Sequence, residues 1–93
     1  MTALRPATLN DADALFDLAR RFATSFPVQP EGFARSLDAI LSSDAARLLV
    51  SVGSSGDIDG YVLAFVHPTF FASGPVAWVE EIRVDVAVGS DRR

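Results

Sequence analysis

Hydrophobic residues in the first half of the chain recur at the spacing of an amphipathic helix. Between positions 15 and 26 they fall at i, i+3, i+4, i+7, i+8 and i+11, and charged residues occupy the other side. Thr8 and Asp11 have the spacing of a capping box, so this helix should begin at Thr8, and Pro27 should end it. A second helix should begin at Pro30, because proline fits the first turn of a helix. Its apolar stripe consists of Phe33, Leu37, Ile40 and Leu41.

From Arg47 onward the pattern is typical of β-strands. Three runs rich in apolar and β-branched residues cover residues 47–52, 60–67 and 76–84. The middle run is apolar almost throughout, so we expect it to be covered on both faces, and Pro68 should end it. With a short strand at residues 4–7, the sequence predicts an α+β fold. Its order is a short strand, two helices and then a three-stranded antiparallel meander.

Composition narrows the classes of partner and site. The chain has 93 residues, enough for one domain, and 12 acidic residues against 8 arginines. This acidic balance argues against a nucleic-acid partner, because binding to phosphates needs clustered cations. With no cysteine and one histidine, we assign no disulfide and no metal site. No apolar run approaches the ~20 residues that span a bilayer, and the N-terminus lacks a signal-peptide core, so we expect a cytoplasmic protein without a membrane partner.

Three stretches, in order, carry a family resemblance. They are residues 4–8 followed by Asp11 and Ala12 (LRPAT..DA), residues 58–62 (IDGYV) and residues 78–85 (WVEEIRVD). Together they resemble the N-terminal half of a GNAT-type, acetyl-CoA-dependent N-acetyltransferase. The resemblance covers residues 1–85, which we interpret as the N-terminal part of such a domain, and leaves 86–93 as an irregular C-terminal tail. That tail does not match the Arg/Gln-x-x-Gly-x-Gly/Ala loop by which the family binds the coenzyme A pyrophosphate.

The resemblance implies a carboxylate base on the last predicted strand. Acyl transfer to an amine needs a group that accepts the amine proton, and an acidic residue of this strand often has that role in the family. Glu80 and Glu81 lie on opposite faces of a strand, so at most one points into an acceptor pocket. We prefer Glu80 and keep Glu81 as the second choice. The alternative is that both are solvated or paired with Arg83.

The resemblance also implies residues for the two substrates. Main-chain groups of Ile82, Arg83 and Val84 would bind the pantetheine arm of acetyl-CoA and polarise its thioester carbonyl. The acceptor, a primary amine of a small molecule or peptide, would contact Phe26, His67 and Phe70. Tyr61, the only tyrosine, is either a residue of the core or an acid that reprotonates the coenzyme A thiolate; we favour the core.

Two functions therefore remain open. The first is an N-acetyltransferase, truncated before the pyrophosphate loop. The second is a noncatalytic truncated fragment that persists as a homodimeric α+β module, because the open edge of the last strand and uncovered apolar faces favour self-association. We expect a homodimer in either case.

Overall fold

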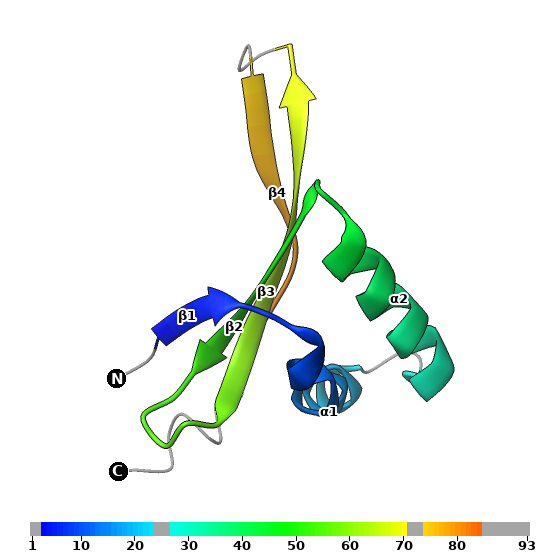
Figure 1. The fold of residues 1–93 in the computed structure, drawn as a ribbon, viewed down its shortest axis with the longest axis vertical. Helices are drawn as coiled ribbons and strands as arrows, with labels where there is room; N and C mark the ends of the chain where they lie inside the picture. The colour runs from blue at the N-terminus through cyan, green and yellow to red at the C-terminus, as the bar shows by residue number, and fades with distance from the viewer. Residues whose placement is uncertain (1–2, 24–26, 71–73, 85–93) are drawn as a thin grey trace.

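The structure, a computed structural model, describes residues 3–23, 27–70 and 74–84. Phe26 and the expected tail at 86–93 lie outside the described residues. In chain order the elements are β1 (Ala3–Pro6), the 3-10 helix η1 (Leu9–Asp11), α1 (Ala12–Phe22), α2 (Pro30–Ser42), β2 (Ala46–Val52), β3 (Ile58–Thr69) and β4 (Gly74–Val84). This order confirms the α+β prediction (Figure 1).

The four strands form one antiparallel sheet in the order β1-β2-β3-β4. The last three strands are the expected meander. The short first strand joins the same sheet, since it pairs with β2 and Ala3 lies opposite Val52. Both helices are inserted in the chain between these two neighbouring strands.

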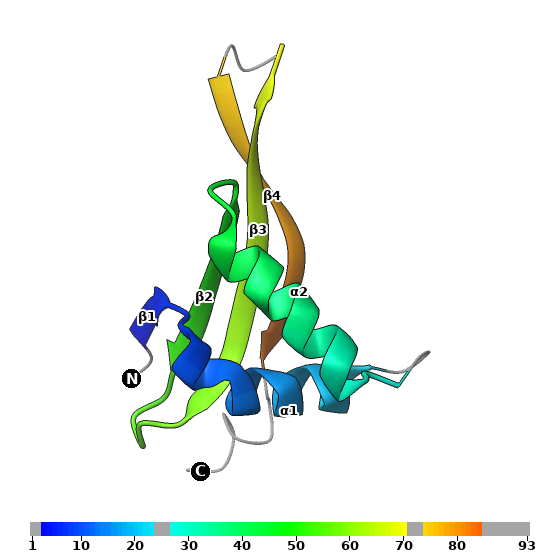
Figure 2. The same ribbon diagram turned by 45° about the vertical axis from the view of Figure 1, so that its right-hand side comes forward.

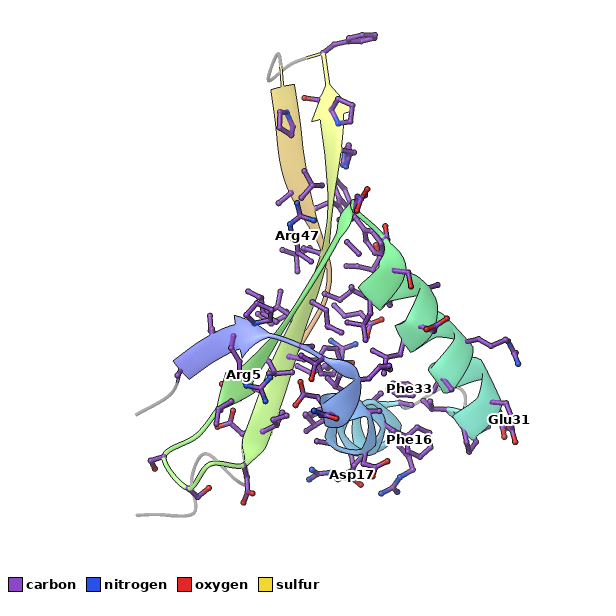
Figure 3. The ribbon with its side chains drawn as sticks, viewed as in Figure 1. Arg5, Phe16, Asp17, Glu31, Phe33 and Arg47 are labelled. Atoms are coloured by element: carbon purple, nitrogen blue, oxygen red, sulfur yellow. The ribbon has the colours of Figure 1, made fainter. Side chains whose placement is uncertain are left out.

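The predicted capping box starts the helical region. The Thr8 hydroxyl accepts a hydrogen bond from a backbone amide, and the Thr8 amide donates to Asp11 Oδ2 over 2.8 Å. Arg5 donates to both oxygens of the same carboxylate, at 2.9 and 2.8 Å, and so ties β1 to the start of the helices (Figure 3). The first turn is the 3-10 helix, and α1 follows it directly. Pro30 begins α2 as predicted.

Both helices cover the same face of the sheet, as Figures 1 and 2 show. The core between the helices and the sheet consists of buried side chains from both layers and from the segment that joins β1 to the helices. These are Ala7, Leu15, Leu18, Leu37, Val50 and Tyr61. Val50, on β2, is 0% exposed. Phe16 of α1 and Phe33 of α2 join the helices through an edge-to-face contact, with ring centroids 5.3 Å apart (Figure 3).

The opposite face of the sheet carries apolar side chains without a helix over it in the described part of the chain. Leu4, Val79, Ile82 and Val84 are between 53% and 61% exposed. The register places Ile82 opposite Val62, so the open face continues from β4 onto β3. The expectation that the middle strand is covered on both faces is therefore wrong for the described residues. Its run of apolar residues includes the side chains of this open face.

The expectation that Pro68 leaves the sheet is also wrong. β3 continues to Thr69, and Pro68 lies opposite Pro75 of β4. The Val66 amide donates to Ala45 on the β2 side of β3, so the alternation of the strand turns the Pro68 nitrogen to that side as well. β2 pairs with β3 only as far as Phe65, and a proline beyond that point costs no ladder hydrogen bond. The β3–β4 hairpin consequently projects past β2 (Figure 1).

Candidate functional site

A cavity of about 710 Å³ lies between the two helices and the sheet. Its walls are mainly apolar and come from α1, α2, the residues between them and the sheet. They include Leu15, Phe22, Val28, Phe33, Leu37 and Leu63. Tyr61 of β3 and two charged residues of β4, Glu81 and Arg83, also line it. The charged groups of the cavity therefore come from the last strand.

A β-bulge decides which glutamate reaches the cavity. Leu63 pairs with Glu81 and Ala64 pairs with Val79, so Glu80 is an extra residue between two regular pairs. Glu81 lines the cavity and is half-buried, whereas Glu80 is exposed and does not line it. The structure thus brings to the cavity the carboxylate that sequence reasoning placed second. The roles of both residues stay predictions.

Tyr61 holds the Glu81 carboxylate. Its hydroxyl donates a hydrogen bond to Glu81 Oε1 over 2.8 Å, and the tyrosine is only 7% exposed. Burial, followed by the contact with Glu81, raises the pKa of Tyr61 above its ordinary value, although the Arg83 charge opposes this. The phenol consequently remains protonated at neutral pH and serves as a fixed donor to the carboxylate.

Arg83 lies opposite Tyr61 across the two strands and is exposed at the rim of the cavity. Its Nη1 donates to the Ile82 carbonyl over 3.0 Å. Within the described ranges, the ion pairs join Arg5 to Asp11, and both Arg20 and Arg21 to Asp17; none involves Arg83. The alternative that Glu80 and Glu81 are paired with Arg83 is therefore wrong for the described residues.

The same arrangement of helices and strands occurs in solved structures. A transcriptional regulator from Bacillus halodurans matches with a TM-score of 0.75 and 18% identity over 96% of this chain and 64% of its own. A GNAT family acetyltransferase from Staphylococcus aureus matches with a TM-score of 0.74 and 14% identity, over 99% of this chain and 65% of its own. AAC(6')-Iy, solved with the bisubstrate analogue CoA-S-monomethyl-acetylneamine, matches with a TM-score of 0.73 and 16% identity, over 98% and 65%.

The chain has a partial GNAT fold. It spans less than two thirds of the length of the three structures just described. No protein-family model and no curated protein sequence matches it. The structural likeness at this level of identity establishes the fold, and the chemistry has to be argued from the chain's own residues.

Within the partial GNAT fold, the residues expected to bind acetyl-CoA lie at the end of β4. Ile82, Arg83 and Val84 pair with β3 on one side, and no described strand pairs with them on the other. Among the described residues, the Ile82 carbonyl accepts from Arg83 Nη1, and no described strand occupies the other main-chain donors and acceptors on that second side. The expected contact with the pantetheine arm is geometrically accessible there, and it stays a prediction.

The residues expected to contact the acceptor are placed differently. His67 and Phe70 lie at or beside the far end of the β3–β4 hairpin, where both are exposed, and neither lines the cavity. The third, Phe26, is outside the described residues. Sequence reasoning did not assign Phe22, Phe33 or Tyr61 to an acceptor pocket and treated them as core. For Tyr61 the signal is the face of the sheet that it shares with Glu81, which becomes visible once the strand register is known. Phe22 and Phe33 belong to the helices that line the cavity over this face.

The described residues contain neither a candidate metal site nor a membrane-spanning helix. Among them, no group of three or more histidine, aspartate or glutamate side chains is arranged to hold a metal ion. In the same ranges, neither helix has the length and apolar character needed to cross a membrane.

Proposed function

We propose that the chain carries the N-terminal part of an acetyl-CoA-dependent N-acetyltransferase, which transfers acetyl to a primary amine of a small molecule or peptide. The observation that supports this most is the Glu81 carboxylate in the apolar cavity, fixed by the buried hydroxyl of Tyr61. The partial GNAT fold supports the same reaction class. Acetyl-CoA is the cosubstrate in this proposal.

In the proposed reaction the amine nitrogen attacks the thioester carbonyl carbon, the C–S bond breaks and coenzyme A leaves as the thiol or thiolate. The attacking nitrogen becomes strongly acidic as the new C–N bond forms, so a carboxylate within hydrogen-bonding reach can accept its proton. We assign this role to Glu81 in preference to Glu80, because Glu81 lines the cavity. Tyr61 occupies one carboxylate oxygen and leaves the other for the amine.

The open side of β4 supplies the second half of the proposal. Main-chain groups of Ile82, Arg83 and Val84 would hydrogen-bond the pantetheine arm, and an amide there would polarise the thioester carbonyl as an oxyanion hole does. This arrangement would bring the thioester to the strand that also carries Glu81, with the amine approaching from the helix-covered face.

Calorimetric titration of the purified chain with acetyl-CoA, followed by a thiol-release assay with primary amines, tests this proposal. We expect saturable acetyl-CoA binding and amine-dependent thiol release. Glu81→Gln should lower kcat/KM by about 10²-fold or more, as for loss of a general base, while Glu80→Gln should retain most of it. Circular dichroism of both variants controls for folding. An absence of acetyl-CoA binding by a folded chain would contradict the proposal.

The apolar face of the sheet supports a second candidate function, a noncatalytic homodimeric α+β module. The exposed side chains of Leu4, Val79, Ile82 and Val84 provide a surface that association would bury. This candidate predicts self-association without affinity for acetyl-CoA. The titration above distinguishes the two functions, and a solution measurement of mass tests the association itself.

A further inference from the structure

The charged groups of the cavity have both signs and lie close together. Glu81 and Arg83 are two residues apart on β4 and both line the cavity, so they project from the same face of the strand. Two residues along a strand correspond to a separation of about 7 Å between their Cα atoms. A carboxylate and a guanidinium therefore stand side by side in a cavity whose walls are mainly apolar.

Neither charge is neutralised by an ion pair within the described residues. Glu81 accepts a hydrogen bond from the neutral Tyr61 hydroxyl at Oε1, and no described contact occupies its Oε2. Arg83 uses one guanidinium nitrogen for the Ile82 carbonyl, out of a fork that carries five N–H donors. The pair thus retains both an acceptor for a cation and donors for an anion.

We propose that the cavity binds an α-amino acid with a large apolar side chain as the acceptor of the proposed acetyl transfer. Its ammonium group would contact Glu81, its carboxylate would contact Arg83, and its side chain would occupy the space among the helix residues. An α-amino acid fits because both its charged groups are attached to one carbon and can meet two neighbouring side chains on a strand. This inference rests on the proposed function for the transfer step, but the binding itself does not require acetyl-CoA.

The apolar walls support the choice of side chain. Leu15, Phe22, Phe33 and Leu63 line the cavity, and its volume of about 710 Å³ accommodates an aromatic ring. Pockets that bind small molecules commonly measure about 300–1,000 Å³ and combine such walls with a few polar groups. A polar side chain would lose hydration against these walls, where Gln29 and Ser36 are the uncharged polar residues on the helix side of the described lining.

The charge of the cavity argues against polycationic acceptors. Glu81 is the only acidic residue among the described residues that line it, and Arg83 would repel additional ammonium groups. An acceptor with an amine but no carboxylate would leave the guanidinium without its partner. A planar carboxylate matches the guanidinium fork and forms charge-assisted hydrogen bonds with it.

Three probes with the same aromatic ring separate these contributions: L-phenylalanine, phenethylamine, which lacks the carboxylate, and 3-phenylpropionate, which lacks the amine. Binding of each to the purified chain is measured by ligand-observed NMR titration. We expect L-phenylalanine to bind at least tenfold more tightly than either of the others. Comparable affinities for L-phenylalanine and phenethylamine would overturn the proposal.

Variants of the two charged residues locate the contacts. Arg83→Gln should weaken L-phenylalanine about tenfold or more and leave phenethylamine within about twofold, because only the first carries a carboxylate. Glu81→Gln should weaken both amines and spare 3-phenylpropionate. The matched controls are Arg47→Gln and Glu31→Gln. Arg47 pairs with Ala64 on the face of the sheet away from the cavity, Glu31 is exposed on α2, and both are labelled in Figure 3.

The outcomes separate this proposal from the proposed function. L-phenylalanine binding that responds to Arg83→Gln, without thiol release from acetyl-CoA, supports the amino-acid site and counts against acetyl transfer by this chain. Thiol release with phenethylamine but not with L-phenylalanine supports acetyl transfer and overturns the amino-acid site. An Arg83→Gln variant that loses acetyl-CoA affinity and retains L-phenylalanine affinity also overturns it, since Arg83 would then serve the cosubstrate.

Discussion

Tyr61 is deeply buried and also hydrogen-bonded to a charged group, as a buried tyrosine hydroxyl needs a partner. It contributes to the core beneath the helices and also donates to Glu81 at the cavity wall. Sequence reasoning assigned it correctly to the core, because the apolar pattern around it is plain. Its partner was not predictable, since the hydrogen bond joins residues on two strands whose register depends on a bulge.

The Tyr61–Glu81 hydrogen bond should be measurable as a coupling free energy. Tyr61→Phe keeps the ring in the core and removes only the donor, so we expect the free energy of unfolding to fall by about 1–2 kcal/mol. In a cycle with Glu81→Ala, the double variant should lose less than the sum of the two single variants. Urea unfolding of the four proteins checks this. Strict additivity would show that the hydrogen bond contributes nothing to stability.

The Arg5–Asp11 pair makes stability depend on acid pH. The Arg5 contact lowers the pKa of Asp11 below its ordinary value, and the Thr8 amide adds to this effect. A carboxyl whose folded pKa is depressed stabilises the fold fully above its unfolded pKa of about 3.9, and this stabilisation is lost as the pH falls through the folded value. Asp11→Asn should therefore destabilise the chain at pH 7, and this destabilisation should shrink as the pH falls through the lowered pKa of Asp11.

Thermal unfolding of Asp11→Asn and the parent chain across this pH range is the measurement. Asp13→Asn is the matched control, since Asp13 is exposed in the first turn of α1. Equal destabilisation by Asp11→Asn at every pH would mean that the lost contact is not ionic.

At the scale of elements, the sequence predicted the helices and strands well, but it predicted less well where a strand ends and how it pairs. The capping box and Pro30 are local signals, so both helix starts followed from neighbouring residues alone. The effect of Pro68 depends instead on whether a neighbouring strand extends that far, which is a property of the sheet. The bulge at Glu80 was equally hidden, because the alternation in residues 76–84 does not mark the extra residue. The preference for Glu80 rested on the resemblance of this strand to the family, and that resemblance does not reveal the bulge.

The pairing of β3 with β4 depends on the absence of a side chain at Gly60. A Cβ atom at this position would lie 2.6 Å from the Arg83 carbonyl oxygen, which is closer than such atoms approach. Gly60→Ala should therefore shift the strands apart and lower the free energy of unfolding by about 1–3 kcal/mol, the usual cost of overpacking.

Urea unfolding of Gly60→Ala tests this, with Gly32→Ala as the contrasting variant. Gly32 lies within α2, and a Cβ there would meet only the end of the Arg35 side chain at 3.8 Å. Alanine should stabilise the helix at that position by about 0.5–1 kcal/mol. A neutral or stabilising Gly60→Ala would contradict the close approach of β4.

At the scale of the whole molecule, the chain is elongated, and in its described part the helices cover one face of the sheet. Its principal extents are 46, 32 and 26 Å, and its radius of gyration is 14.4 Å. A compact domain of this length would have a radius of gyration of about 12 Å. The sequence indicated uncovered apolar surface by resemblance to a longer fold, but it did not show which face of the sheet would be open. That required the register and the position of the helices.

The open face should cause self-association. We expect sedimentation velocity to show a concentration-dependent dimer, because burial of exposed apolar side chains is favourable. Val79→Lys places a charge on this face and should shift the equilibrium toward the monomer. Ala39→Lys, at an exposed position on α2, adds the same charge elsewhere and should leave the equilibrium unchanged. A parent chain that stays monomeric at about 100 μM would contradict this expectation.

The pairing of β1 with β2 also sets the order in which the sheet can assemble. Pro6 lies opposite Leu49, so this pair closes a loop that contains both helices, whereas β2, β3 and β4 pair through short connections. Closing the longer loop costs more chain entropy, and only the pairing of the four residues of β1 offsets this cost. We therefore expect β1 to join the sheet last and to detach first. In hydrogen exchange, amides that bond β1 to β2 should lose protection before those that bond β2 to β3.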